Sequence, residues 1–215
     1  ISFAFDSKSI NIFRSNSVNA KCYDTSSANR NEGSLYIQAI YDFSLKCNSQ
    51  QYSDIDSQTV DNIRLLRKSL QDDIAIVCNG PSVRNIATHY CSNYKQTAVT
   101  CNTTFMNEEL HEYFNFKVIA FADPIFHFGI SAYAAQFREN LEKYLSTNDI
   151  FVSIPQKYLH IFSYHFGLPK NLHLCVLKPS KSKNINIDLM SSTSVKVTGN
   201  ILTYLLFPLA ASLAN

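Results

Sequence analysis

The stretch Asp72–Val83, DDIAIVCNGPSV, joins a short apolar run to an abrupt turn. Residues 74–78 are apolar at consecutive positions and rich in β-branched side chains, which is typical of a strand covered on both faces in a parallel sheet. Asn79, Gly80, Pro81 and Ser82 end this run, because glycine permits a tight turn and proline suits the first turn of a helix. A strand, a glycine turn and a helix start together favour phosphate binding, and an ordinary βα turn is the alternative interpretation.

The same pattern recurs twice along the chain. The stretches TAVTCN, Thr97–Asn102, and FKVIAFAD, Phe116–Asp123, both read as apolar strands that end in a small polar residue. The three strand-end residues Asn79, Asn102 and Asp123 are 23 and then 21 positions apart. This period predicts βαβ units with parallel strands. The carboxyl ends of such strands share one edge of the sheet, and ligands bind there at the topological switch point.

The remaining pattern predicts further helices and strands around this sheet. A helix from Asp54 carries the apolar face Ile55, Val60, Ile63 and Leu66, and a helix over 131–145 carries Tyr133, Phe137, Leu141 and Tyr144. Helices are also expected over 83–90, 107–114, 155–171 and 201–214, and strands over 149–154 and 172–177. The polar segment 178–196 reads as a surface loop or a mobile lid. We therefore predict an α/β fold over 71–215, a Rossmann-like, mostly parallel sheet flanked by helices, preceded by an extension, 1–70, of unknown role.

Charge and cysteine content exclude several classes of function. The chain has 19 Lys and Arg against 17 Asp and Glu, with no dense basic block, so nucleic acid is not an expected partner. Its six cysteines form no CxxC pair and no regular spacing with histidine, which argues against a zinc site. Cys78 and Cys101 lie inside predicted buried strands, where a reduced thiol acts as a small hydrophobe. We expect a reducing, cytoplasmic setting, with a disulfide framework as the alternative.

The two ends of the sequence carry separate expectations. No basic segment followed by an apolar one marks a signal peptide at the start. The apolar stretch 201–214 is too short to cross a bilayer and contains Pro208, so it predicts a buried helix. No residues follow that would cover this helix, and we expect the sequence to be truncated at its C-terminus.

Four stretches together resemble a known enzyme family. IAIVCNGPSV, AVTCNTTF, VIAFADPIFHF and VTGNILTYLLFPLA, in this order, are similar to segments of the bacterial sialyltransferases of glycosyltransferase family 42 and their motility-accessory-factor relatives. The resemblance covers residues 74–214 and implies a GT-A-like variant of the Rossmann-like fold. It also implies an inverting, metal-independent transfer of a sialic-acid-like sugar from a CMP-activated donor to a cell-surface glycan.

The resemblance assigns roles to particular residues. It implies that Asn79, Gly80, Pro81, Ser82 and Asn102 form the nucleotide-sugar site, and that Thr198 and Gly199 lie by the phosphate or carboxylate of the donor. Asparagine offers a donor and an acceptor to cytosine or ribose, and amides at a helix start suit phosphate. No metal or further cofactor is expected. Peripheral association with the inner face of a membrane and a homo-oligomer are left open.

The catalytic residues stay open at the level of sequence. Asp123 stands where the sialyltransferases carry Asn, and a carboxylate repels an anionic sugar unless it faces a ribose hydroxyl or a cation. The catalytic His of the family lies beyond the last residue of this sequence, so Asp123 and His127 are the weak local candidates. One alternative function is a Mg²⁺-dependent, pterin diphosphokinase-like enzyme in which Asp123 holds the ion. The other is a non-catalytic nucleotide-binding or interaction domain.

Overall fold

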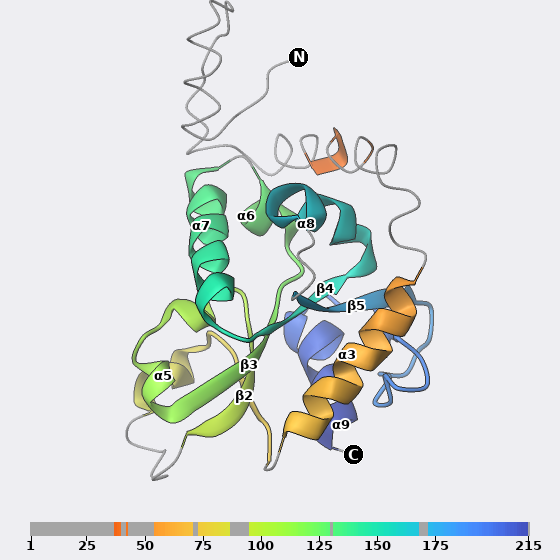
Figure 1. Cartoon of the computed structure of the whole chain (residues 1–215), viewed down its shortest axis with the longest axis horizontal. Helices are drawn as coiled ribbons and strands as arrows, with labels where there is room; N and C mark the ends of the chain where they lie inside the picture. The colour runs from red at the N-terminus through yellow and green to blue at the C-terminus, as the bar shows by residue number, and fades with distance from the viewer. Residues whose placement is uncertain are drawn as a thin grey trace, which may run out of the picture.

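The computed structural model describes residues 37–39, 42, 54–70, 73–86, 95–129, 131–167 and 172–214. Most of the predicted extension 1–70 lies outside this part of the chain. The described portion is an α/β fold in which six parallel strands form a curled sheet flanked by helices (Figure 1). The predicted fold class, a Rossmann-like parallel sheet, is therefore confirmed.

The six strands follow one another across the sheet in the order of the sequence. They are β1 (Ala75–Val77), β2 (Gln96–Cys101), β3 (Phe114–Ala120), β4 (Phe151–Pro155), β5 (His173–Ser180) and β6 (Ser194–Lys196). Every neighbouring pair is parallel, with Val77 beside Thr100 in β1 and β2 and Lys178 beside Ser194 in β5 and β6. Because this order never reverses among the described strands, they contain no topological switch point, and that part of the prediction is wrong.

Helices lie on both faces of the sheet. They are α3 (Ile55–Ser69), the 3₁₀ turns η1 (Pro81–Asn85), η2 (Thr104–Met106) and η3 (Gln156–Tyr158), α5 (Leu110–Tyr113), α6 (Pro124–Phe128), α7 (Ala132–Thr147), α8 (Leu159–Phe166), the π-helical turn η4 (Leu202–Leu206) and α9 (Phe207–Ala214). Among the described helices, none has the length and apolar character needed to cross a membrane.

Alternation along β3 sends side chains into two cores. Ile119 and Phe121 pack with residues of α7 and α8 on one face, whereas Val118 and Ala120 pack with residues of α3, η4 and α9 on the other. A strand has a side-chain period of two, so a strand covered by helices on both faces must be apolar at consecutive positions. The continuous apolar runs in the sequence have this cause.

The buried faces of α7 and α3 differ from the predicted ones at one residue or position each. Ser131 caps α7 by accepting a hydrogen bond from the Ala134 amide at 3.2 Å, and Ala134, Phe137 and Leu141 are buried. Tyr133, which was predicted on that face, is 53% exposed. In α3 the buried positions are Ile55, Thr59, Ile63 and Leu66, as predicted except that Thr59 replaces Val60.

Thr59 is buried because it completes the edge of the sheet. The strand β6 pairs with residues 178–180 of β5, so among the described strands none pairs with the backbone of Leu174 and Val176 on that side. The Thr59 hydroxyl accepts a hydrogen bond from the Val176 amide at 3.0 Å, and the Asn62 amide donates to the Leu174 carbonyl at 2.8 Å. Helix α3 thus supplies hydrogen bonds that a longer strand would have made.

The polar segment 178–196 is not a loop throughout. Its first residues finish β5 and its last form β6, a strand of three residues in which only Val195 is buried. Between them Leu189 is fully buried, and its amide donates to the Ser212 hydroxyl on α9 at 2.8 Å. Short strands with one apolar residue have no readable period, which explains why the sequence did not predict β6.

Candidate functional site

A cleft of about 580 Å³ opens at the carboxyl edge of the sheet. Residues that follow β2, β3, β4 and β6 line it: Asn102, Ala122, Asp123, Pro124, Ile125, Lys157, Val197, Thr198, Gly199, Asn200, Ile201 and Tyr204. The chain leaves β3 toward the face covered by α7 and α8, and leaves β6 toward the face covered by α9. The cleft therefore lies outside the carboxyl ends of the strands, where ligands of open α/β sheets bind, although the strand order does not reverse there.

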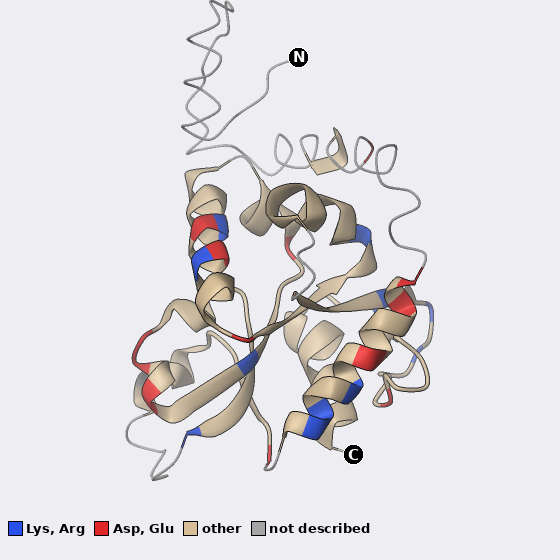
Figure 2. Cartoon of the chain, in the orientation of Figure 1, with Lys and Arg blue, Asp and Glu red and all other residues tan. Residues whose placement is uncertain are grey.

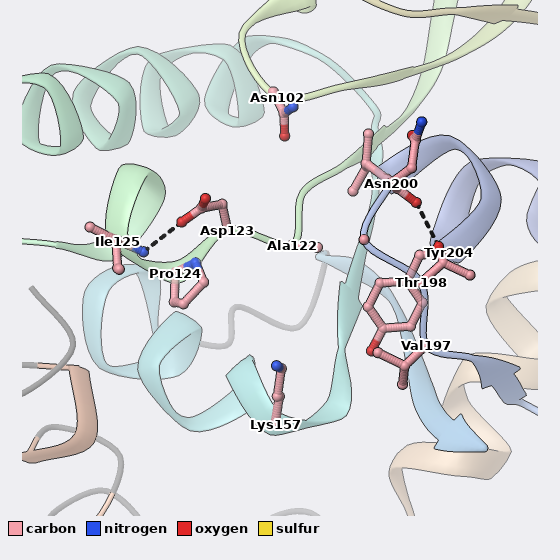
Figure 3. Close-up of a pocket in the computed structure, with 12 residues that line it drawn as sticks. Asn102, Ala122, Asp123, Pro124, Ile125, Lys157, Val197, Thr198, Asn200 and Tyr204 are labelled. Carbon is pink, nitrogen blue, oxygen red and sulfur yellow. Dashed lines mark hydrogen bonds between the residues drawn. The ribbon is translucent and has the colours of Figure 1, made fainter. Parts of the chain in front are cut away.

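Asn102 occupies the end of β2 in an unusual backbone conformation. Its φ of 51° lies in the left-handed region, and it is the one non-glycine residue with positive φ in the described part of the chain. Asparagine tolerates this region better than most residues, and its amide still donates to the Ala120 carbonyl of β3 at 3.0 Å. Figure 3 shows its side chain pointing into the cleft from above. Backbone outliers of this kind cluster at functional sites.

Asp123 is the N-cap of α6 as well as a wall of the cleft. One carboxylate oxygen accepts hydrogen bonds from the amides of Ile125 at 3.0 Å and Phe126 at 3.3 Å, and the first of these is drawn in Figure 3. Pro124 occupies the first helical position, where the missing N–H costs nothing. The cap fixes the carboxylate without consuming its second oxygen, which leaves an acceptor for a hydroxyl at the sheet edge.

The segment after β6 carries the opposite wall. Asn200 caps the last helix by accepting from the Leu202 amide at 2.9 Å, and the hydroxyls of Thr198 and Thr203 are 2.8 Å apart. The helix then begins with a π-helical turn, because Pro208 has no N–H for the Tyr204 carbonyl and its ring crowds that carbonyl. Such turns frequently occur at functional sites.

Lys157 and Tyr204 are among the lining residues that the sequence analysis missed. Lys157 follows β4 and extends into the cleft from η3, facing Asn102 across the space (Figure 3). Its ammonium lies 4.6 Å from the centre of the Tyr158 ring. Tyr204 comes from the last helix, whose apolar composition concealed it. A polar residue shortly after the predicted strand 149–154 was a signal that could have found Lys157.

The two phenols near the cleft are held in their protonated form. Burial, together with the nearby Asp123 carboxylate, raises the pKa of Tyr158 to about 12. Burial, with a smaller contribution from Tyr158, raises the pKa of Tyr204 to about 12. Both hydroxyls therefore remain hydrogen-bond donors at neutral pH.

The structure separates the predicted site residues into two groups. Asn102, Asp123, Thr198 and Gly199 come together in the cleft. The stretch Asn79, Gly80, Pro81 and Ser82 follows β1, the strand beside β2, and does not line the cleft. Gly80 makes the expected turn there, donating to the Cys78 carbonyl at 2.8 Å, and Pro81 begins η1.

His127 lies in the aromatic core and not in the cleft. Its side chain is 3% exposed and packs on Phe137 with ring centres 4.5 Å apart and on Phe121 at 5.3 Å. Burial lowers the pKa of His127 to about 4, so the ring is neutral at physiological pH. The ring of His127 is placed in the core, whereas its backbone amide donates at 3.2 Å to the carbonyl of Asp123, which lines the cleft.

A second hollow, of about 460 Å³, lies near the opposite edge of the sheet. It is lined by Arg64, Arg67, Lys68 and Met190, and the three basic residues belong to the C-terminal part of α3, where the ribbon in Figure 2 is partly blue. Because α3 leads into the start of β1, this end lies toward the amino edge of the strands. Arg64 is already paired with Asp61 at 3.0 Å. The hollow has none of the predicted site residues.

The cleft combines one cation, one carboxylate and several neutral hydrogen-bonding groups among its described residues. Lys157 can attract an anion, Asp123 can accept from hydroxyls, and Asn102 offers both a donor and an acceptor. Comparison with models of protein families, with curated proteins and with solved structures found no match. The chemistry of the cleft must therefore be argued from its own residues and from the resemblance given above.

Proposed function

We propose that the protein binds a nucleotide-activated sugar, CMP-linked, in the cleft and transfers the sugar to a glycan acceptor. The observation that carries the proposal is the convergence of Asn102, Asp123, Thr198 and Gly199, which lie far apart in the sequence, on one cleft at the sheet edge. Its volume falls within the range of about 300–1,000 Å³ that small-molecule sites occupy. The resemblance to sialyltransferase-like enzymes names these same positions.

The two charged residues of the cleft suit different parts of such a donor. Lys157 and the amides around Gly199 favour the phosphate, because an ammonium and unpaired amides at a helix start both attract anions. Asp123 favours the ribose hydroxyls or the incoming acceptor hydroxyl. In a single displacement the acceptor oxygen forms the new bond to the anomeric carbon while the bond to phosphate breaks, so configuration inverts.

Calorimetric titration with CMP, UMP, GDP and ATP, each with and without Mg²⁺, tests the proposal. We expect CMP to bind selectively and without the metal. Binding of ATP that requires Mg²⁺ would favour the diphosphokinase-like alternative, in which Asp123 holds the ion. Absence of binding with all four nucleotides would favour a non-catalytic interaction domain.

A lysine pair makes the titration specific for the cleft. We expect Lys157→Ala to weaken CMP binding by about tenfold, because it removes a charge-assisted hydrogen bond to phosphate. Lys143→Ala is the matched control, since Lys143 is an exposed lysine on α7 that does not line the cleft. Equal affinity of the two variants would place the nucleotide elsewhere on the molecule.

A further inference from the structure

Two cysteines lie side by side where β1 and β2 end. Val77 is in register with Thr100, so the next residues along the two parallel strands are Cys78 and Cys101. Cys101 belongs to a buried core cluster, and the partly buried Cys78 packs against the same cluster. Neighbouring strands are about 4.8 Å apart, which falls within the range of about 4.4–6.8 Å between the Cα atoms of disulfide-bonded cysteines.

The environment makes the two thiols chemically unequal. Cys78 is half-buried, and the hydrogen bond from the Cys101 thiol lowers the pKa of Cys78 to about 7. Cys101 is 2% exposed, and the same hydrogen bond together with burial raises its pKa well above the usual range. The thiolate is the reactive form of cysteine, so Cys78 is the residue of the pair that reacts with an oxidant. Cys101 is the thiol that can then attack the oxidised Cys78.

We propose that Cys78 and Cys101 are a redox modification site that forms a reversible disulfide when the protein meets a peroxide. The Cys78 sulfur attacks one oxygen of hydrogen peroxide, the O–O bond breaks, and Cys78 sulfenic acid and one water are formed. The Cys101 sulfur then attacks the Cys78 sulfur, the S–O bond breaks, and a second water leaves with the Cys101 proton. Two thiols have lost two electrons to the peroxide, and a dithiol reductant reverses the change.

The disulfide would act on the cleft through the residue that follows Cys101. Asn102 lines the cleft with a φ of 51°, and it is joined directly to Cys101. A disulfide bond fixes the side-chain torsions and the Cα separation of both cysteines, so it restricts the backbone that leads from Cys101 into Asn102. The disulfide itself does not depend on the proposed function.

Peptide mapping of the full chain tests the disulfide. The reduced protein is treated with hydrogen peroxide, remaining thiols are blocked with N-ethylmaleimide, and the unreduced digest is analysed by mass spectrometry. We expect a peptide linked through Cys78 and Cys101 that dithiothreitol separates. Linkage of Cys78 to a different cysteine, or an unoxidised Cys78 after other thiols have reacted, would overturn the proposal.

Variants separate the chemistry from damage to the fold. In Cys101→Ala we expect the Cys78 sulfenic acid to persist and react with dimedone, and alkylation of Cys78 by iodoacetamide at pH 7 to slow about tenfold. Cys175→Ala is the matched control, because Cys175 is also buried in a strand but lies on β5. It should still form the Cys78–Cys101 link, and loss of the link in this control would overturn the assignment.

Hydrogen exchange tests the coupling to the cleft without any nucleotide. Amide exchange in residues 102–106 is compared between the reduced and oxidised full chain. We expect a change of about threefold or more there. Equal exchange in both states would overturn the coupling to Asn102. Because no ligand is used, this result is independent of whether the protein binds CMP.

Discussion

Asp123 has two separable duties, one in the helix and one in the cleft. Its carboxylate accepts from two amides at the start of α6 and also faces the ligand space. Asparagine caps a helix as well as aspartate does, whereas loss of the cap costs about 1 kcal/mol. We expect Asp123→Asn to unfold in urea like the natural protein and to lower the transfer rate by about a hundredfold, if this carboxylate accepts the acceptor proton.

The comparison with Asp123→Ala makes that prediction specific. This variant loses both the cap and the charge, so it should be less stable by about 1 kcal/mol as well as impaired in transfer. Equal transfer rates for Asp123→Asn and the natural protein would show that the carboxylate is only a cap.

His127 makes the fold sensitive to acid. Its pKa is about 4 in the folded protein, against about 6.5 in an unfolded chain, so the unfolded state binds more protons between these values. The contribution of His127 to the free energy of unfolding is greatest above pH 6.5. It falls by about 3 kcal/mol as the pH drops to 4. We expect His127→Phe to abolish this part of the acid loss, because phenylalanine suits the aromatic core. Urea unfolding at pH 7 and pH 4.5 measures the difference, and an unchanged acid loss would contradict the assignment.

The buried hydroxyl of Thr59 is one of the hydrogen-bonding groups that join α3 to β5. The Thr59 side chain accepts from the Val176 amide at 3.0 Å and donates to the Val176 carbonyl at 3.5 Å. Valine has the same shape but leaves both backbone groups without a partner, which costs about 1–3 kcal/mol. We expect Thr59→Val to lower the free energy of unfolding by that amount and to speed amide exchange at Val176.

Thr97→Val is the control for this prediction. Thr97 is a half-buried residue of β2, and the structure gives its side chain no hydrogen bond within the described chain. Valine is favoured in strands, so we expect a change within about 0.5 kcal/mol. Equal destabilisation by both variants would show that the hydroxyl of Thr59 is not what joins the two elements.

The sequence predicted these elements unevenly, for physical reasons. Strands buried on both faces, such as β3, leave a continuous apolar run, and Ser131 marks the start of α7. Strand β6 has only three residues, and its neighbour Leu189 is buried through contacts that depend on α9. Local pattern therefore finds elements whose burial is regular along the chain, and misses those held by distant segments.

The parallel arrangement of the strands in the sheet explains which site residues could be predicted from the sequence. Parallel strands bring Asn102 and Asp123 to one edge whatever their order, so their convergence follows from the period alone. The residues after β6 join them in the cleft, whereas those after β1 do not, and the period along the first three strands does not predict this difference. Tyr204 comes from the apolar segment after β6, where no local pattern distinguishes a lining residue from a core residue.

A ligand bound in the cleft should stabilise the entire fold, because the lining residues follow four different strands. A ligand that binds only the folded state adds about 2.7 kcal/mol at a hundred times its dissociation constant. For a chain of this size that raises the melting temperature by about 5–10 °C.

Gly199→Ala tests whether the cleft is responsible, since an added Cβ at Gly199 would meet no atom within 4 Å. We expect this variant to melt as the natural protein does without ligand and to lose most of the rise with CMP, because the methyl group occupies ligand space. A full rise in Gly199→Ala would contradict binding against this wall, whereas a lower melting temperature without CMP would mean that the glycine serves the fold.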